Sequence, residues 1–218
     1  MLRFLVFDLD DTLYPPGTGL FYEVGRRIHT FLQERLGLSL EEARLLRRQY
    51  YEKYGTTLRG LQIHHQIDAD EYLAYVHDVD VSAYLQPNPQ MDAALATLPH
   101  EKVIFTNATA EYARRVLGVL GLGRHFGRIF DIYALHFYCK PNPEAYRILL
   151  AGLPAQGPEC LLIEDNLRNL QAGKAAGMRT VLVNNDTDDG TGVDFRTDIL
   201  QIATVVRTIE CADASPPR

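Results

Sequence analysis

Cysteine is scarce in this sequence of 218 residues, which contains only Cys139, Cys160 and Cys211. Three widely spaced cysteines are too few for a disulfide framework or a zinc site, and they indicate a reducing compartment. The apolar stretch at the N-terminus is too short for a signal peptide, and no apolar run approaches the ~20 residues of a membrane span. We therefore expect a soluble, cytoplasmic protein without a membrane partner.

Basic residues are also in the minority, with 22 Lys and Arg against 28 Asp and Glu, a net charge of −6. A nucleic acid polymer or an anionic membrane requires a basic face, so this excess of acids argues against both as partners. The excess of acids remains compatible with a small anionic substrate that is held by a local positive site. Apolar residues make up 46% of the chain, which is enough for a substantial core.

Short apolar runs alternate with helical patterns along most of the chain. This alternation predicts an α/β fold with a Rossmann-like, doubly wound parallel sheet. We expect strands at residues 2–7, 102–106, 127–134, 160–165 and 179–183, and helices at 110–120, 142–153 and 167–177.

The segment between the first two predicted strands has a different texture, with apolar residues at helical spacing. It is too long for a crossover helix, so we expect an inserted helical cap domain. Helices are expected from about residue 20 to 36, and at 39–54, 68–79 and 87–98. The predicted organisation is a catalytic core at 1–16 and 99–210, a cap at 17–98 and a disordered tail at 211–218.

Polar residues follow the predicted strands at the points where each strand ends. In a parallel sheet these carboxyl ends meet at one edge, where ligands bind. Taken singly, each residue has an ordinary alternative: a turn aspartate, a helix cap or a surface lysine. The residues concerned are Asp8, Asp10 and Asp11 after the first strand, Thr106 and Asn107 after the second, Lys140 after the third, and Glu164 and Asp165 after the fourth.

Together these side chains suit phosphoryl transfer. Asp8 and Asp165 can share a magnesium ion, which prefers hard oxygen ligands. Thr106, Asn107 and Lys140 provide donors for phosphate oxygens. One carboxylate can attack phosphorus while a second, two residues away, serves as the general acid and base.

Four segments, "DLDDTL", "TNA", "KPNPEAY" and "LIEDNLRNLQAGKAAGM", resemble the motifs of the haloacid dehalogenase-like hydrolase superfamily. The resemblance extends over about residues 2–185 and implies a Rossmann-like core with a helical cap. It implies that Asp8 is the nucleophile and Asp10 the general acid and base. It also implies that Thr106 and Lys140 stabilise the phosphate.

The same resemblance implies a magnesium site formed by Asp165, Asp8 and the main-chain carbonyl of Asp10. Glu164 and Asn169 are expected directly behind these ligands. The dehalogenases of the superfamily lack an acid at the position of Asp10, so the resemblance implies a phosphatase.

The cap segments "DDTLYPPGTGLF" and "YEKYGTTLRGLQIHH" are similar to the pyrimidine 5′-nucleotidase subgroup. The predicted substrate is therefore a small phosphorylated metabolite, specifically a nucleoside monophosphate. Residues 54–61 are interpreted as a loop over the substrate, with Arg59 as a contact or, alternatively, as a solvated charge. A sugar phosphate or phosphoglycolate phosphatase and a phosphomutase stay open. A phospho-accepting signalling module is disfavoured by the cap-sized insertion and by Asp10.

Overall fold

The computed structural model describes residues 1–184 and 191–214. Within these residues, six strands form one sheet in which all neighbouring strands are parallel. The order β3-β2-β1-β4-β5-β6 is the doubly wound order of Rossmann-like folds, so the predicted fold class is confirmed. The strands are β1 (Phe4–Phe7), β2 (Glu101–Phe105), β3 (Phe126–Phe130), β4 (Cys160–Glu164), β5 (Arg179–Val183) and β6 (Phe195–Thr197).

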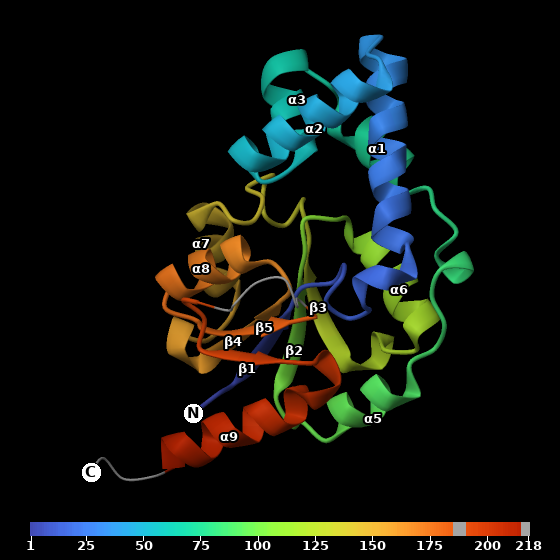
Figure 1. The fold of residues 1–218 in the computed structure, drawn as a ribbon. Coiled ribbons are helices and arrows are strands. Elements are labelled where there is room, and N and C mark those ends of the chain that lie inside the picture. The colour runs from blue at the N-terminus through green and yellow to red at the C-terminus, as the bar shows by residue number, and fades with distance from the viewer. Residues whose placement is uncertain (185–190, 215–218) are drawn as a thin grey trace.

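Helices cover both faces of the sheet (Figure 1). Side chains alternate between the faces along each strand, so Phe7 packs toward one helical layer and Val6 toward the other. One layer consists of α5 (Pro89–Ala96), α6 (Ala110–Leu120) and α9 (Ile202–Ala214), and the other of α7 (Pro143–Gly152) and α8 (Leu167–Ala175). Burial on both faces explains why the strands are continuously apolar.

The cap stands above the carboxyl edge of the sheet and contains its own apolar core (Figure 1). Its helices are α1 (Leu20–Leu36), α2 (Leu40–Tyr54), α3 (Thr57–His65) and α4 (Ala69–His77). A capping box starts α2, because the Ser39 hydroxyl accepts from the Glu42 N–H while the Glu42 carboxylate accepts from the Ser39 N–H. The cap core is centred on Phe31, Leu61 and Tyr72.

Three expectations about element placement need correction. Residues 54–61 are not a loop, because Thr56 caps α3 through the Arg59 N–H and only Gly55 and Thr56 separate α2 from α3. Helix α5 belongs with the core rather than the cap, since Met91 and Leu95 are buried in the sheet's core cluster.

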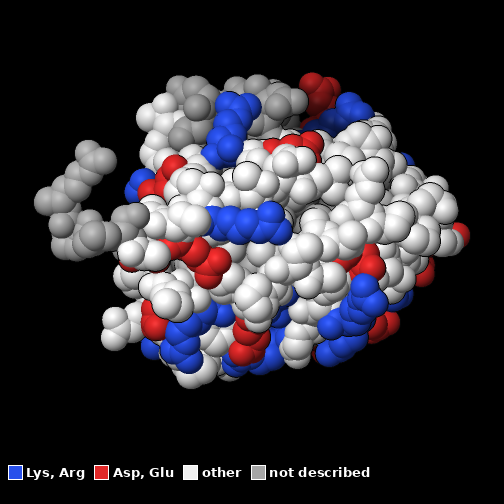
Figure 2. Space-filling model, turned by 90° about the horizontal axis from the view of Figure 1, so that it is seen from below, with Lys and Arg blue, Asp and Glu red and all other residues white. Residues whose placement is uncertain are grey.

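The predicted disordered tail is wrong for residues 211–214, which complete α9. Asp213 anchors this last turn by pairing with Arg179 at 2.9 Å and with the Met1 amine at 3.4 Å. Residues 215–218 of the predicted tail lie outside the described residues. Figure 2 views the molecule from the side of α9, where the basic and acidic side chains drawn in colour are interspersed.

In the part of the chain that the structure describes, no helix combines the length and the apolar character needed to cross a membrane.

Candidate active site

The register of the sheet brings three strand ends to one level. Phe7 at the end of β1 pairs with Ile104 of β2 and with Ile163 of β4. The residues just beyond these positions therefore lie at one edge, beneath the cap. Those that line a common cavity are Asp8, Asp10, Asp11, Thr106, Asn107, Lys140, Glu164, Asp165 and Asn169.

Lys140 occupies the centre of the polar cluster and is only 2% exposed. Its ammonium donates to Asp8 Oδ1 at 2.6 Å and to Glu164 Oε2 at 2.7 Å. Burial alone would lower the pKa of Lys140, but Asp8 and Glu164 raise it above its ordinary value. The amine is therefore a fixed positive charge that holds the Asp8 carboxylate in place.

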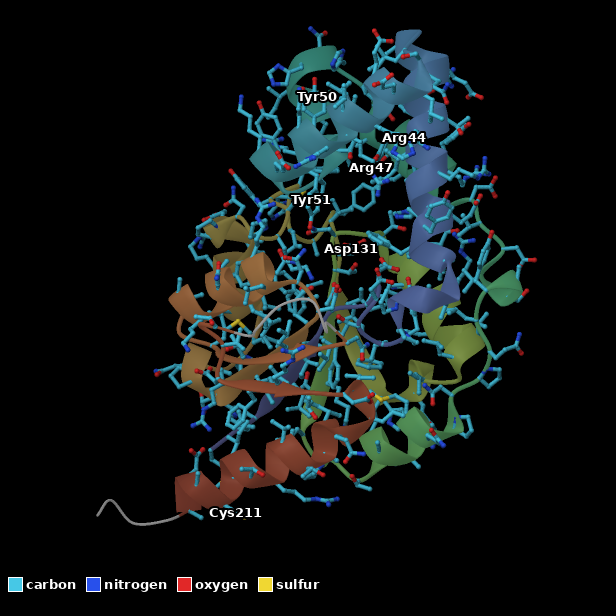
Figure 3. All side chains as sticks on the ribbon, in the orientation of Figure 1. Arg44, Arg47, Tyr50, Tyr51, Asp131 and Cys211 are labelled. Carbon is cyan, nitrogen blue, oxygen red and sulfur yellow. The ribbon has the colours of Figure 1, made fainter. Side chains whose placement is uncertain are left out.

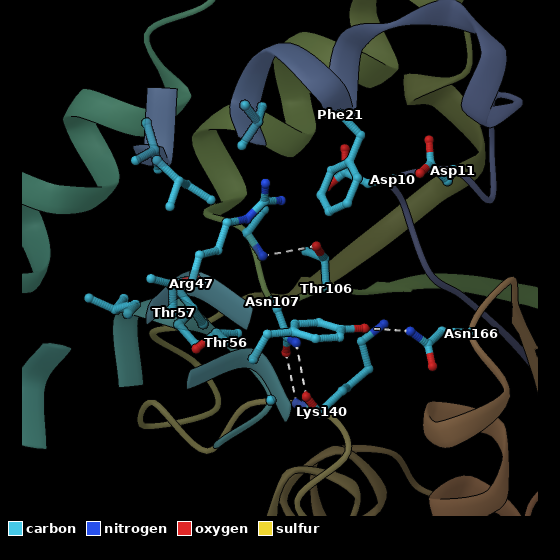
Figure 4. A pocket seen from close by; sticks show the side chains of 18 of the residues that line it. Asp10, Asp11, Phe21, Arg47, Thr56, Thr57, Thr106, Asn107, Lys140 and Asn166 are labelled. Atoms are coloured by element: carbon cyan, nitrogen blue, oxygen red, sulfur yellow. Dashed lines mark hydrogen bonds between the residues drawn. The ribbon is translucent and has the colours of Figure 1, made fainter. Parts of the chain in front are cut away.

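Asn107 positions Lys140 with its side chain. Its Oδ1 accepts from the Lys140 backbone N–H at 2.8 Å, and its Nδ2 donates to the Lys140 carbonyl at 3.1 Å (Figure 4). The carboxamide was expected to donate to phosphate; this backbone uses one of its two N–H donors, so that role stays a prediction. The neighbouring Thr106 hydroxyl accepts from the Ala108 N–H at 3.0 Å, which leaves its own O–H available as a donor.

Asp10 is held by two tyrosine hydroxyls that the sequence did not point to. Tyr14 and Tyr112 both donate to Asp10 Oδ1, at 2.5 and 2.9 Å. Burial raises the pKa of Asp10 to about 6, the Tyr14 hydrogen bond opposes this, and the charge of Asp8 adds to it. Such a carboxyl group is suited to give and take a proton near neutral pH. The sequence contained one signal for these contacts. Tyr14 lies only four residues after Asp10, and a tyrosine hydroxyl that becomes buried needs a hydrogen-bond partner.

Asp8, Glu164 and Asp165 form a cluster of acids in which one oxygen of each lies within 4.8 Å of the others. Thr12 links two of them, donating to Asp165 Oδ1 at 2.9 Å and lying 3.4 Å from Asp8 Oδ2. Burial and the charge of Asp8 raise the pKa of both Glu164 and Asp165. A divalent cation would relieve this repulsion, and Mg²⁺ prefers such hard oxygens. The donor set therefore fits magnesium.

Asp11 and Asn169 also line the cavity near these acids, and they differ in their hydrogen bonding. Asp11 adopts a φ of +59°, and its Oδ1 is buried without a hydrogen-bond partner among the described residues. Burial, followed by the charges of Asp10 and Asp8, raises the pKa of Asp11 to about 7. Asn169 lines the cavity, and its carbonyl accepts from the Tyr146 hydroxyl at 2.7 Å.

The cavity between core and cap has a volume of about 500 Å³, within the range of small-molecule sites. The cap closes over it through direct contacts to the core. Asn166 donates to the Tyr51 hydroxyl at 2.6 Å, and a Cβ at Gly55 would lie 2.4 Å from the Lys140 carbonyl oxygen. Apolar walls are provided by Phe21, Val24, Ile28, Leu58, Leu73, Val76 and Ile132.

The structure does not bring Arg59 to this cavity. Its guanidinium donates to Gln62 Oε1, one turn along α3, at 3.4 Å. The arginines that line the cavity are Arg44, Arg47 and Arg48 of α2. The sequence could not single them out, because the helical pattern does not tell which side of α2 faces the core.

Residues 2–177 match the family described as haloacid dehalogenase-like hydrolase. The chain belongs to this family. The resemblance seen in the four sequence motifs is thereby confirmed at the family level, and the protein is a haloacid dehalogenase-like (HAD-like) hydrolase.

Two curated proteins are similar to this HAD-like chain. "Phosphate metabolism protein 8" of Saccharomyces cerevisiae is 28% identical over 192 residues, covering 81% of this chain but only 60% of the yeast protein. "Phosphoglycolate phosphatase" of Pectobacterium atrosepticum is 26% identical over 196 residues, covering 83% of this chain and 79% of that protein.

Solved HAD structures show the same fold at low sequence identity. A HAD phosphatase from Thermococcus onnurineus superposes with a TM-score of 0.61 at 19% identity, covering 94% of this chain and 98% of that one. The HAD-hydrolase YfnB from Bacillus subtilis, bound to magnesium, gives a TM-score of 0.63 at 16% identity, covering 94% and 99%. An L-2-haloacid dehalogenase from Xanthobacter autotrophicus gives 0.60 at 18%, covering 95% and 99%. The fold is thus common to phosphatases and dehalogenases, and the choice between them depends on the site.

Proposed function

We propose that the protein is a magnesium-dependent phosphomonoesterase that works through an aspartyl-phosphate on Asp8. The observation that carries the proposal is the pair of acids with different surroundings. Asp8 is held by the Lys140 ammonium, whereas Asp10 is held by two tyrosine hydroxyls, and both line one cavity. One acid thus lies against a positive charge in position for attack, and the other has surroundings suited to proton transfer.

In the first step, an Asp8 oxygen attacks the phosphorus and the bond from phosphorus to the ester oxygen breaks. Asp10 gives its proton to that leaving oxygen. In the second step, Asp10 takes a proton from water, the water oxygen attacks the same phosphorus, and the bond to Asp8 breaks. Inorganic phosphate leaves, and both carboxyl groups return to their starting states.

The residues that would hold magnesium are Asp8, Asp165 and the main-chain carbonyl of Asp10, with Glu164 beside them. When bound, the ion supplies positive charge that offsets the negative charge of the phosphate and of the surrounding carboxylates. Lys140 and the Thr106 hydroxyl lie in the same cavity and are proposed to donate to phosphate oxygens.

We propose a nucleoside monophosphate, specifically a pyrimidine nucleotide, as the substrate. The apolar cavity walls and the aromatic ring of Phe21 suit a flat base better than a fully hydroxylated sugar. The cap segments that resemble pyrimidine 5′-nucleotidases also support this assignment. A phosphatase for small phosphorylated acids is the second candidate, because the Pectobacterium relative carries the name phosphoglycolate phosphatase.

The test is phosphate release with Mg²⁺ from UMP, CMP, AMP, GMP, glucose 6-phosphate and phosphoglycolate. We expect the highest kcat/KM for UMP or CMP, by a modest factor, because each cap contact contributes roughly 1–3 kcal/mol. A tenfold advantage for a sugar phosphate or for phosphoglycolate would refute the nucleotide assignment. A single labelling event without turnover would instead support a phospho-accepting module.

A further inference from the structure

Arg47 places a guanidinium in the cavity from the cap side (Figures 3 and 4). Its Nη1 donates a hydrogen bond to His29 Nε2 at 3.3 Å. Burial lowers the pKa of Arg47, and burial together with Arg47 and Arg44 lowers the pKa of His29. His29 is therefore a neutral acceptor at pH 7, and Arg47 keeps most of its five N–H donors unused.

The arginines of the cap differ in whether a carboxylate partners them. Four of them are paired with acids, namely Arg26 with Glu23, Arg27 with Asp78, Arg35 with Glu71 and the cavity-lining Arg48 with Glu52, and Arg59 donates to Gln62. Arg44 and Arg47 line the cavity, and neither has a carboxylate partner among the described residues. Arg44 is exposed, whereas Arg47 is partly buried. A partly buried guanidinium without a carboxylate partner costs free energy, so the surroundings of Arg47 favour an acceptor supplied by a ligand.

The neighbouring helix is shaped to admit this guanidinium. A Cβ at Gly25 of α1 would lie 2.7 and 2.9 Å from the two terminal nitrogens of Arg47. Any side chain at this position would push the arginine away. Glycine here thus lets Arg47 lie against the α1 backbone while still facing the cavity.

We propose that Arg47, assisted by Arg44, binds acceptor oxygens on the organic part of the substrate while the phosphate lies at Asp8. This inference rests on the proposed phosphatase function and narrows its substrate class. The preferred esters carry a flat group with acceptor oxygens, because the apolar walls around Phe21, Val76 and Ile132 suit a flat group and a guanidinium fork matches paired acceptors. Such oxygens come from a pyrimidine carbonyl or from a carboxylate.

Two matched substrate pairs test the subsite in the full-length protein with Mg²⁺. Phenyl phosphate lacks an acceptor that 4-carboxyphenyl phosphate has, and ribose 5-phosphate lacks the base that UMP has. We expect Arg47→Met to lower kcat/KM roughly 10–100-fold for the acceptor-bearing member of at least one pair, with less than threefold change for its partner. Loss in the phenyl pair alone identifies a carboxylate, and loss in the nucleotide pair alone identifies a base carbonyl.

Several results would overturn the inference. Equal losses on all four substrates would assign Arg47 to the phosphate or to cap folding, and no loss would remove it from binding. Arg47→Lys, which keeps the charge but not the fork, should show an intermediate loss if the variant melts like the parent. If no substrate releases phosphate with the parent protein, the proposed function fails instead, so the two failures are distinguishable.

Two other arginine variants complete the design. Arg35→Met removes an exposed cap arginine that is paired with Glu71, and it should leave both substrate ratios unchanged. Arg59→Met tests the residue that the sequence suggested, and we expect a change below twofold. An effect of Arg59→Met equal to that of Arg47→Met would contradict the assignment of the subsite to α2.

Discussion

Removing the Tyr112 hydroxyl should weaken proton transfer by Asp10 without disturbing the fold. In Tyr112→Phe the ring is kept, so its stack on His77, with centroids 4.5 Å apart, persists. The change deletes one hydrogen bond to the Asp10 carboxylate, and bonds to charged groups are worth roughly 1.5–3 kcal/mol. Because Tyr14 still donates to the same oxygen, we take the lower value, which corresponds to about a tenfold slower step.

The assay is single-turnover phosphorylation of the enzyme with UMP and with p-nitrophenyl phosphate. The nucleoside leaving group needs a proton and p-nitrophenolate does not, so we expect about a tenfold loss for UMP and less than threefold for p-nitrophenyl phosphate. Asp10→Asn should show the same pattern with a loss of roughly 10²–10⁴-fold.

Tyr146→Phe serves as the control for this experiment. It removes a buried hydroxyl that donates to the Asn169 carbonyl rather than to Asp10, so the dependence on leaving group should stay unchanged. Equal losses of Tyr112→Phe on both substrates would refute the reasoning.

Three other predictions concern single contacts. Lys140→Ala should lower kcat by at least ~10²–10³-fold in phosphate release, and a loss under tenfold would contradict its role. Gly55→Ala should lower kcat/KM and the melting temperature, since its φ is +85° and a Cβ would meet the Lys140 carbonyl; unchanged values in both would exclude a tight contact there. Burial, then Arg115, lowers the pKa of His77 from 6.5 to about 3, so stability is lost as pH falls below 6.5. At pH 4.5 this loss amounts to about 3 kcal/mol of unfolding free energy measured with urea, and His77→Phe should lack it; identical pH dependence in both proteins would contradict the predicted loss.

The sequence was sufficient to predict five strands of the central sheet and the residues at its carboxyl edge, but not the short edge strand β6. The run Phe4–Phe7 followed by Asp8 indicates a strand buried on both faces, and parallel register then places its end beside Thr106 and Asp165. These inferences succeed because they rest on local patterns and on a topology with few alternatives.

Contacts between distant segments could not be predicted in this way. Tyr112 lies 102 residues from Asp10 along the chain, and only the packing of α6 against the first strand's loop brings them together. Likewise, the choice between Arg47 and Arg59 depends on how α2 and α3 are rotated against α1. The end of α9 depends on Asp213 reaching Arg179, which a polar C-terminal sequence does not reveal.

The identity of the phosphorylated residue tests the central claim most directly. The protein would be mixed with substrate and Mg²⁺, quenched in acid within one turnover, and analysed by peptide mass spectrometry. We predict one phosphoryl group on the peptide that contains Asp8, and neither label nor turnover above background in a folded Asp8→Asn variant or in EDTA. A label on another residue, or robust turnover by Asp8→Asn, would contradict the mechanism.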